Sequence, residues 1–237
     1  PLQVFPHMKL KNFDYELPEE LIAQAPCADR DRSRLLVVHR DTGRLEHRRF
    51  RDLSEYLCPG DAIVVNDSRV IPARLFGNKE SGGRVEFLLL ACEDERTALW
   101  TVLLKPGRRV RAGTSISFAK DAKAEILEKL PDHTWRVRFV TDTDFSTFLN
   151  RHGYAPLPPY IKRNGATGIS AADLERYQTV YARVPGSVAA PTAGLHFTPE
   201  VLAALRNRHS GCGGHAACGL RHFPAHRKRR RRRSRHG

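Results

Sequence analysis

Short apolar runs separated by turn residues dominate the chain, and their texture changes along it. Residues 35–38 and 62–65 are continuous apolar runs whose length fits buried strands. From residue 71 to residue 140, β-branched runs alternate with turn signals, which is typical of a compact antiparallel barrel or sandwich. The pattern therefore predicts a small β domain inserted into a domain that mixes strands and helices.

Helical patterns are shorter. Residues 14–24 combine an early proline, acidic residues and a shared apolar face, which predicts a short helix, and residues 50–57 predict another. Residues 173–182 mix charges with two tyrosines. If this segment is helical, Tyr177 and Tyr181 share one face because they lie four residues apart; aromatic packing is the alternative use of the two rings.

A shaped loop is predicted at residues 186–197, which follow neither a helical nor a strand period. Its small residues let a backbone approach a ligand closely, because short side chains stand aside and glycine reaches positive φ. Thr198 then offers an N-cap oxygen and Pro199 suits a first helical position, so the loop ends at the positive end of a helix. A ligand site is the functional interpretation, and a tight crossover loop packed under a helix is the alternative.

Two further segments carry candidate chemistry. Residues 66–69, Asn-Asp-Ser-Arg, end the apolar run at 62–65, where α/β folds place ligand contacts; an Asx turn explains the same residues. Residues 154–163 form a proline-fixed extended segment with aromatic and cationic side chains. This segment suits base stacking, and a rigid connector between domains is the alternative.

The net charge of +14 comes mostly from the end of the chain. Eleven of the 40 Lys and Arg residues, and no Asp or Glu, lie in residues 206–237, so the body is only mildly basic. Apolar runs are too short to span a bilayer and no secretion signal is visible, so we expect a cytoplasmic protein without a membrane partner. Cys27, Cys58 and Cys92 lack metal-ligand spacing.

Six ordered segments together resemble the S-adenosylmethionine:tRNA ribosyltransferase-isomerases, the queuosine-biosynthesis family. Long ordered matches of this kind are far more specific than any single short motif. The segments are residues 17–24, 33–37, 66–75, 156–161, 175–182 and 186–197.

The resemblance implies a mixed α and β fold: a discontinuous α/β domain with an inserted antiparallel β-barrel domain. Residues 8–70 and 151–205 are expected to form the two parts of the α/β domain, and residues 71–150 the barrel. The resemblance stops near residue 205, whereas family members continue further. We therefore expect the carboxyl-terminal part of the α/β domain to be missing, and the product to be poorly folded or inactive.

The resemblance also implies a reaction without a metal or cofactor. The ribosyl part of S-adenosylmethionine, a consumed substrate, is transferred and isomerised onto a 7-aminomethyl-7-deazaguanine in tRNA. Adenine and methionine leave, and epoxyqueuosine-tRNA remains. The expected partners are S-adenosylmethionine and tRNA carrying a queuosine precursor, and a monomer is expected.

This chemistry needs a base for a proton next to the sulfonium and a proton donor for adenine. The candidate acid/base residues are His196, Asp67 and Tyr177. Backbone donors of the loop would line the nucleoside, and the arginines would hold a carboxylate or phosphate through a bidentate fork. The candidate substrate-binding residues are Asn66, Ser68, Arg69, Arg74, Tyr160, Arg176, Thr179, Tyr181, Ala190, Pro191, Thr192, Ala193, Gly194 and Phe197.

Residues 206–237 form a basic tail with three interpretations. Polybasic runs bind nucleic acid by counterion release. Cys212, His215, Cys218 and His222 have the spacing of a small metal knuckle. Out-of-frame translation is favoured over both, because one choice of codons for residues 220–225 reads Ser-Gly-Thr-Phe-Arg-Pro one base later, close to a segment that the family has. The tail is expected to be disordered. A non-enzymatic RNA-binding protein that uses the barrel and the tail is the alternative function.

Overall fold

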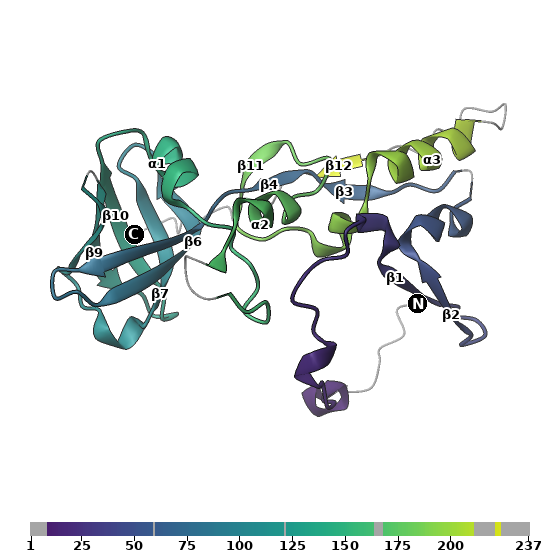
Figure 1. Ribbon diagram of the computed structural model, residues 1–237, viewed down its shortest axis with the longest axis horizontal. Coiled ribbons are helices and arrows are strands. Elements are labelled where there is room, and N and C mark those ends of the chain that lie inside the picture. Colours follow the sequence, from purple (N-terminus) through teal and green to yellow (C-terminus); the bar gives the residue numbers. More distant parts are fainter. Residues whose placement is uncertain (1–8, 59, 121, 164–167, 211–220, 224–237) are drawn as a thin grey trace, which may run out of the picture.

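The structure, a computed structural model, describes residues 9–58, 60–120, 122–163, 168–210 and 221–223. Figure 1 shows an elongated molecule, with a β-barrel at one end and a two-stranded hairpin and the helix α3 at the other. The segments that precede and follow the barrel in the sequence lie side by side between these ends.

A closed antiparallel barrel with the strand order β10-β7-β6-β5-β8-β9 confirms the predicted β domain. Its inner face follows the period of two that extended backbone imposes: Val85, Phe87 and Leu89 are fully buried, and the residues between them are not. The strands are β5 (Arg74–Lys79), β6 (Arg84–Asp94), β7 (Leu99–Lys105), β8 (Ser115–Ala119), β9 (Ala122–Lys129) and β10 (Trp135–Thr141), with a 3₁₀ turn at Gly107–Arg109.

Helix α1 (Phe145–His152) closes one end of the barrel. Asp144 caps the helix, because its side chain accepts a hydrogen bond from the Thr147 amide at 2.9 Å. Phe145 and Phe148 then reach the aromatic cluster of the core, and the Phe145 ring lies 4.8 Å from that of Phe139. Barrel and helix therefore share one core.

Parallel strand pairs join the two flanking parts of the chain. Strand β4 (Ser68–Val70) pairs with β11 (Val184–Ser187), and β3 (Val64–Asn66) pairs with β12 (Arg221–Phe223). In each pair one strand precedes the barrel in the sequence and the other follows it. This pairing and the inserted barrel confirm the predicted mixed fold.

Two small cores support this flanking part. One lies around Val70, Leu157 and Tyr177, next to helix α2 (Ala171–Arg176). The other lies between the 3₁₀ helix η4 (Phe50–Tyr56) and helix α3 (Pro199–Ser210). Outside them, β1 (Arg34–Val38) and β2 (Leu45–Arg49) form an antiparallel hairpin, whose turn contains Gly43 at a φ of 70°.

Two predictions near the amino terminus need correction. Residues 14–24 do not form one helix: short 3₁₀ turns at Leu10–Phe13 and Glu19–Leu21 stand apart, and Leu21 is 71% exposed. Without a surface to pack against, so short an apolar stripe does not stabilise a helix. The strand predicted at residues 35–38 is present, but Leu36 and Val38 are each 55% exposed, so it is not buried.

Helix α2 ends at Arg176, so the single helical face predicted for Tyr177 and Tyr181 is wrong. Tyr177 is the carboxyl-terminal cap of α2, and the chain continues as turns to Tyr181. The Tyr177 amide still donates to the Asp173 carbonyl at 2.9 Å in the α-helical pattern, whereas the Gln178 amide donates to the Glu175 carbonyl at 3.3 Å, a tighter turn that ends the helix.

Parts of the basic tail lie in regular secondary structure. Helix α3 continues through Arg206 to Ser210, and Arg221–Phe223 form the strand β12. Backbone pairing with β3 satisfies the hydrogen bonds of β12, and the disorder of the tail stays a prediction. Residues 211–220 and 224–237 lie outside the described residues.

Candidate functional site

The predicted loop begins at the end of β11 and contains a 3₁₀ turn, Thr192–His196, before helix α3. Thr198 caps α3 as predicted, since its hydroxyl accepts from the Val201 amide at 3.2 Å. The Gly194 amide donates to the Pro191 carbonyl at 2.7 Å. These bonds hold the loop in a fixed curve beside the small cores.

Gly194 is where the loop approaches its neighbours most closely. A Cβ atom there would stand 2.2 Å from the Tyr181 hydroxyl and 3.0 Å from Cγ2 of Thr179. Both distances are too short for any larger residue without a shift. At Gly194 the loop therefore lies against two other candidate residues, Thr179 and Tyr181, a contact that fits the packed-loop alternative, while the approach of a ligand to the loop stays a prediction.

Tyr177 joins several predicted site residues. Burial raises the pKa of its hydroxyl, a hydrogen bond with the backbone of Ala190 partly opposes this, and Tyr160 and Arg74 act on it electrostatically. Tyr177 is only 7% exposed, whereas Tyr160 is 52% exposed. The structure thus brings Tyr177, Ala190, Tyr160 and Arg74 close to one another. They come from the end of α2, the loop, the proline-rich segment and β5.

Asp67 is a buried carboxylate between β3 and β4. Its side chain is 5% exposed and accepts from Arg183, whose Nη2 lies 3.0 Å from Oδ2. The Asp67 carbonyl also accepts from the Arg183 amide at 2.7 Å. The Arg183 side chain remains 64% exposed, so the ion pair is in contact with solvent on the arginine side. The Asp67 carboxylate accepts hydrogen bonds from Arg183.

Residues 66–69 form the Asx turn that was one alternative for them, since Asn66 Oδ1 accepts from the Ser68 amide at 2.9 Å. Ser68 is 2% exposed and Thr179 is 6% exposed, and neither side-chain hydroxyl has a hydrogen-bond partner among the residues that the structure describes. Buried polar atoms without partners are costly and rare. They mark these two predicted residues as candidates for a ligand contact.

The predicted arginines divide into two kinds. Arg176 donates to the carbonyls of Cys27 and Ala28 at 2.5 and 3.2 Å, and Arg74 donates to the Leu157 carbonyl at 2.7 Å. Both guanidiniums thus hold chain segments together. Arg69 is exposed, and its side chain has no hydrogen bond or ion pair within the part of the chain that the structure describes.

His196 lies in the core between η4 and α3. Its ring centroid is 5.3 Å from that of Phe50, and Phe50 makes an edge contact with Phe197 at 4.9 Å. Phe197 also meets Tyr181, with centroids 6.0 Å apart. Aromatic contacts therefore fix the orientation of His196, and Tyr181 and Phe197 connect this core to Gly194.

Three supporting residues were missed in the sequence. Gln178 bonds both backbone groups of Val70, at 3.0 Å from the amide and 2.6 Å to the carbonyl. Arg30 donates to the carbonyls of Glu175, Arg176 and Leu195. The signal for Gln178 was its place between Tyr177 and Thr179, whereas the pairing of Arg30 and of Arg183 had no local signal.

No cluster of metal-binding side chains occurs among the described residues. Cys212, His215 and Cys218 of the possible metal knuckle lie outside them, as does most of the tail. In the same described part, none of the helices is both long and apolar enough for a membrane span. The candidate site is therefore built from polar and aromatic groups.

The fold and the site define a class: mixed α and β proteins with an inserted barrel, in which a loop of small residues adjoins buried hydroxyls and a buried tyrosine. A sequence family described as queuosine biosynthesis protein matches residues 10–213. The chain belongs to this family, which confirms the family resemblance.

Curated relatives agree with this assignment. A protein from Syntrophus aciditrophicus is 46% identical over 217 residues, covering 84% of this chain and 60% of the relative. One from Carboxydothermus hydrogenoformans is 51% identical over 200 residues, covering 84% and 57%. Both are named S-adenosylmethionine:tRNA ribosyltransferase-isomerase. The chain thus spans less than two thirds of the length of these relatives.

A solved structure is also similar in sequence. It is the S-adenosylmethionine tRNA ribosyltransferase from Thermotoga maritima, 33% identical, with a TM-score of 0.31, and the match covers 90% of this chain and 56% of that one.

Proposed function

We propose that the protein acts as an S-adenosylmethionine:tRNA ribosyltransferase-isomerase. The ribosyl group of S-adenosylmethionine would pass, with isomerisation, to the aminomethyl group of a 7-deazaguanine in tRNA, and adenine and methionine would leave. The observation that carries the proposal is the family match over residues 10–213, which includes every candidate site residue. The names of the curated relatives support the same reaction.

Tyr177 is our proposed proton donor. Departing adenine must gain a proton at a ring nitrogen, and a group with a raised pKa keeps its proton at neutral pH. The Tyr177 hydroxyl is protonated at neutral pH, because burial raises its pKa above the ordinary value of a tyrosine. It can therefore give a proton but not take one, although the raised pKa also makes it a weaker acid than an exposed tyrosine. Asp67 and His196 are then the candidate bases for the proton next to the sulfonium.

The substrate would lie along the loop. Residues Ala190 to Phe197 supply backbone donors, and the unpartnered hydroxyls of Ser68 and Thr179 supply further polar contacts. Arg69 would bind the methionine carboxylate or a phosphate, because its fork matches either group. S-adenosylmethionine is consumed as a substrate, so the proposed reaction uses no cofactor or metal. We also propose that the protein is a monomer and that it acts in the cytoplasm.

Adenine release tests this proposal. The purified protein is incubated with S-adenosylmethionine and tRNA that carries 7-aminomethyl-7-deazaguanine, and adenine release that needs both substrates is expected. Release without tRNA contradicts the proposal. A longer relative, assayed beside this chain, tests the expectation that the product is poorly folded or inactive: release by the relative and none by this chain would bear out that expectation and contradict the proposal that this chain is active.

Tyr177→Phe tests the role of the hydroxyl. We expect kcat to fall by about 10²-fold, the lower range for loss of a general acid, with unchanged unfolding. Tyr15→Phe is the matched control, because Tyr15 is 73% exposed. Near-normal turnover of Tyr177→Phe would remove Tyr177 as the donor and leave the assigned reaction standing.

The alternative, a non-enzymatic basic RNA-binding protein, is not favoured, since the named relatives are enzymes. It predicts salt-sensitive RNA binding without adenine release. The adenine assay therefore separates the two functions directly.

A further inference from the structure

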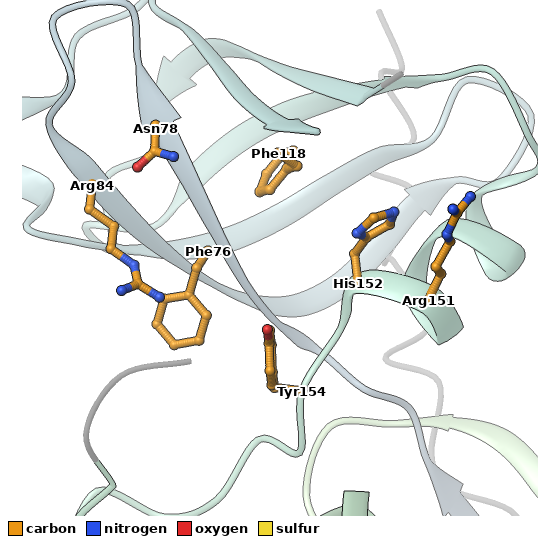
Figure 2. A pocket seen from close by; sticks show the side chains of 7 residues that line it. All are labelled: Phe76, Asn78, Arg84, Phe118, Arg151, His152 and Tyr154. Carbon is orange, nitrogen blue, oxygen red and sulfur yellow. The ribbon is translucent and has the colours of Figure 1, made fainter. Parts of the chain in front are cut away.

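A hollow of about 320 Å³ lies on the barrel. Two of its lining residues, Phe76 and Tyr154, also pack against the small core that contains Tyr177. The hollow forms where β5, β6 and β8 meet the end of α1 and the residue Tyr154. Figure 2 shows its seven side chains: Phe76, Asn78, Arg84, Phe118, Arg151, His152 and Tyr154. None of them belongs to the candidate site described above.

The lining is positively charged. It contains two guanidiniums and one imidazole and no carboxylate. Glu86, two residues from Arg84 on β6, is already paired with Arg74 at 3.3 Å. Within the described ranges, the side chains of Arg84 and Arg151 have no hydrogen bond or ion pair. Both guanidiniums are therefore available to an anion, and phosphate matches their geometry.

The lining is also aromatic. The Arg84 guanidinium lies 4.5 Å from the centroid of the Phe76 ring, and the Phe76 ring meets Tyr154 edge to face at 5.5 Å. In Figure 2 the Tyr154 ring stands between Phe76 and His152. Aromatic rings and guanidinium planes are the surfaces on which unpaired bases stack.

The barrel holds this lining in place. A Cβ atom at Gly77 would stand 2.6 Å from Ile116 and 3.0 Å from Phe118, so glycine allows β5 and β8 to approach closely. Phe118 is part of the barrel core and meets Phe148 of α1 at 5.6 Å. The floor of the hollow is thus formed before any ligand arrives.

We propose that this hollow binds one unpaired nucleotide of the RNA substrate, with the base against Tyr154 and the phosphates on its two sides at Arg84 and Arg151, which Figure 2 shows on opposite sides of the hollow. The combination of cations and a stacking ring selects a nucleotide over S-adenosylmethionine, which has no phosphate. The inference rests on the proposed function in one respect: the proposed reaction identifies the RNA as tRNA.

Equilibrium binding tests the phosphate contacts. Fluorescence anisotropy measures the affinity of the protein for tRNA and for a single-stranded oligouridylate at several salt concentrations. In the double variant Arg84→Gln and Arg151→Gln, both RNAs should bind about tenfold more weakly, and the salt dependence should fall by about 0.7 per lost contact. Arg138→Gln, an exposed arginine of β10 outside the hollow, should leave both unchanged.

Tyrosine variants test the stacking. Tyr154→Ala should weaken binding about tenfold, within the range for loss of one stacked base, and Tyr154→Phe should bind normally because the ring remains. The fluorescence of Trp100 and Trp135, both in barrel strands, confirms that each variant is folded. Normal RNA binding by the folded double arginine variant overturns the proposal.

Three further outcomes are decisive. If adenosine monophosphate displaces the oligouridylate at an equal concentration, the hollow is a site for free nucleotides, and the RNA proposal is wrong. If the protein releases no adenine but the arginine variants still weaken RNA binding, the proposed reaction fails and the hollow remains an RNA site. If turnover is normal and the variants bind RNA normally, only the hollow is wrongly assigned.

Discussion

The barrel and the flanking α/β part are stabilised in different ways. Among the described residues, the barrel strands expose two large hydrophobic side chains, Leu103 and Val140, and enclose one continuous core. The flanking part exposes many more: Leu10, Phe13, Tyr15, Leu17, Leu21, Leu36, Val38, Leu45, Val64, Tyr160, Val180 and Val184. Its two cores are small, so individual polar contacts matter more there.

The β1–β2 hairpin shows this reliance on polar contacts. Glu46 accepts hydrogen bonds from His39, Arg44, Arg48 and Tyr56. The His39 contact first, together with the others, lowers the pKa of the Glu46 carboxyl to about 2. The apolar residues of this hairpin are half exposed, so the hydrogen bonds of the Glu46 carboxylate are a main source of its stability.

The largest expected difference between the two parts is the cost of removing an apolar side chain. Phe87 is fully buried and contacts Phe118 and Phe139. Phe87→Ala should lower the free energy of unfolding by about 3–5 kcal/mol through lost burial and a new cavity. Leu36→Ala, at a residue 55% exposed, should change it by less than about 0.5 kcal/mol.

Urea titration followed by tryptophan fluorescence measures the first effect, because both tryptophans lie in barrel strands. Far-ultraviolet circular dichroism measures the second. Equal costs for the two substitutions would show that the hairpin is packed as tightly as the barrel.

A smaller effect is expected from a single polar contact in the flanking part. Gln178→Ala would leave the amide and carbonyl of Val70 without their partner, and Val70 is 3% exposed. The expected loss is about 1–3 kcal/mol, the cost of an unsatisfied buried group. Hydrogen exchange at the Val70 amide should accelerate.

The matched control for this substitution is Gln24→Ala. The Gln24 side chain donates to the Tyr160 carbonyl at 3.0 Å in an exposed setting, where water replaces a lost bond. A loss equal to that of Gln178→Ala would mean that burial of the contact does not matter.

The contrast also explains what the sequence could reveal. The barrel was predictable because its contacts repeat at a period of two along one continuous stretch, residues 74–141. The flanking part joins distant segments: Arg30 bonds carbonyls of Glu175, Arg176 and Leu195, and no local pattern announces such contacts. Residues 14–24 had a helical pattern but no surface to pack against.

The structure shows where the candidate site residues lie, whereas their roles in binding and catalysis stay predictions. The resemblance pointed to Ser68 and Thr179, whose unpartnered hydroxyls fit a binding role. It also suggested anion binding for Arg176, whose guanidinium in fact holds the backbone at Cys27 and Ala28. Residue type alone does not distinguish an arginine that binds a ligand from one that joins two segments, because both use the same donors.

The smallest expected effect comes from two helix caps, one in each part. The Thr198 hydroxyl accepts from the Val201 amide, and Thr198→Ala should cost about 1 kcal/mol at pH 7. Its contact with the exposed Glu200 carboxyl, which lowers the pKa of that group, adds only a small part that acid removes. Asp144 caps α1 as a carboxylate, and its hydrogen bonds with Thr147 lower its pKa from 3.8. Because the pKa is lower in the folded protein than in the unfolded chain, the Asp144 carboxylate stabilises the fold at a pH above its unfolded pKa. This stabilisation is lost as the pH falls through the lowered pKa of the folded protein.

Asp144→Ala should therefore destabilise the protein at pH 7 and much less once acid has protonated the carboxyl. Urea titrations of both variants at pH 7 and at pH 3 or below measure the contrast, with Asp144→Asn as the control, since asparagine caps a helix without titrating. If acid reduces the effect of Thr198→Ala as strongly as that of Asp144→Ala, protonation of Asp144 is not the cause. The acid effect on Thr198→Ala would then point to Glu200, because a hydrogen bond with the Thr198 hydroxyl lowers the pKa of its carboxyl.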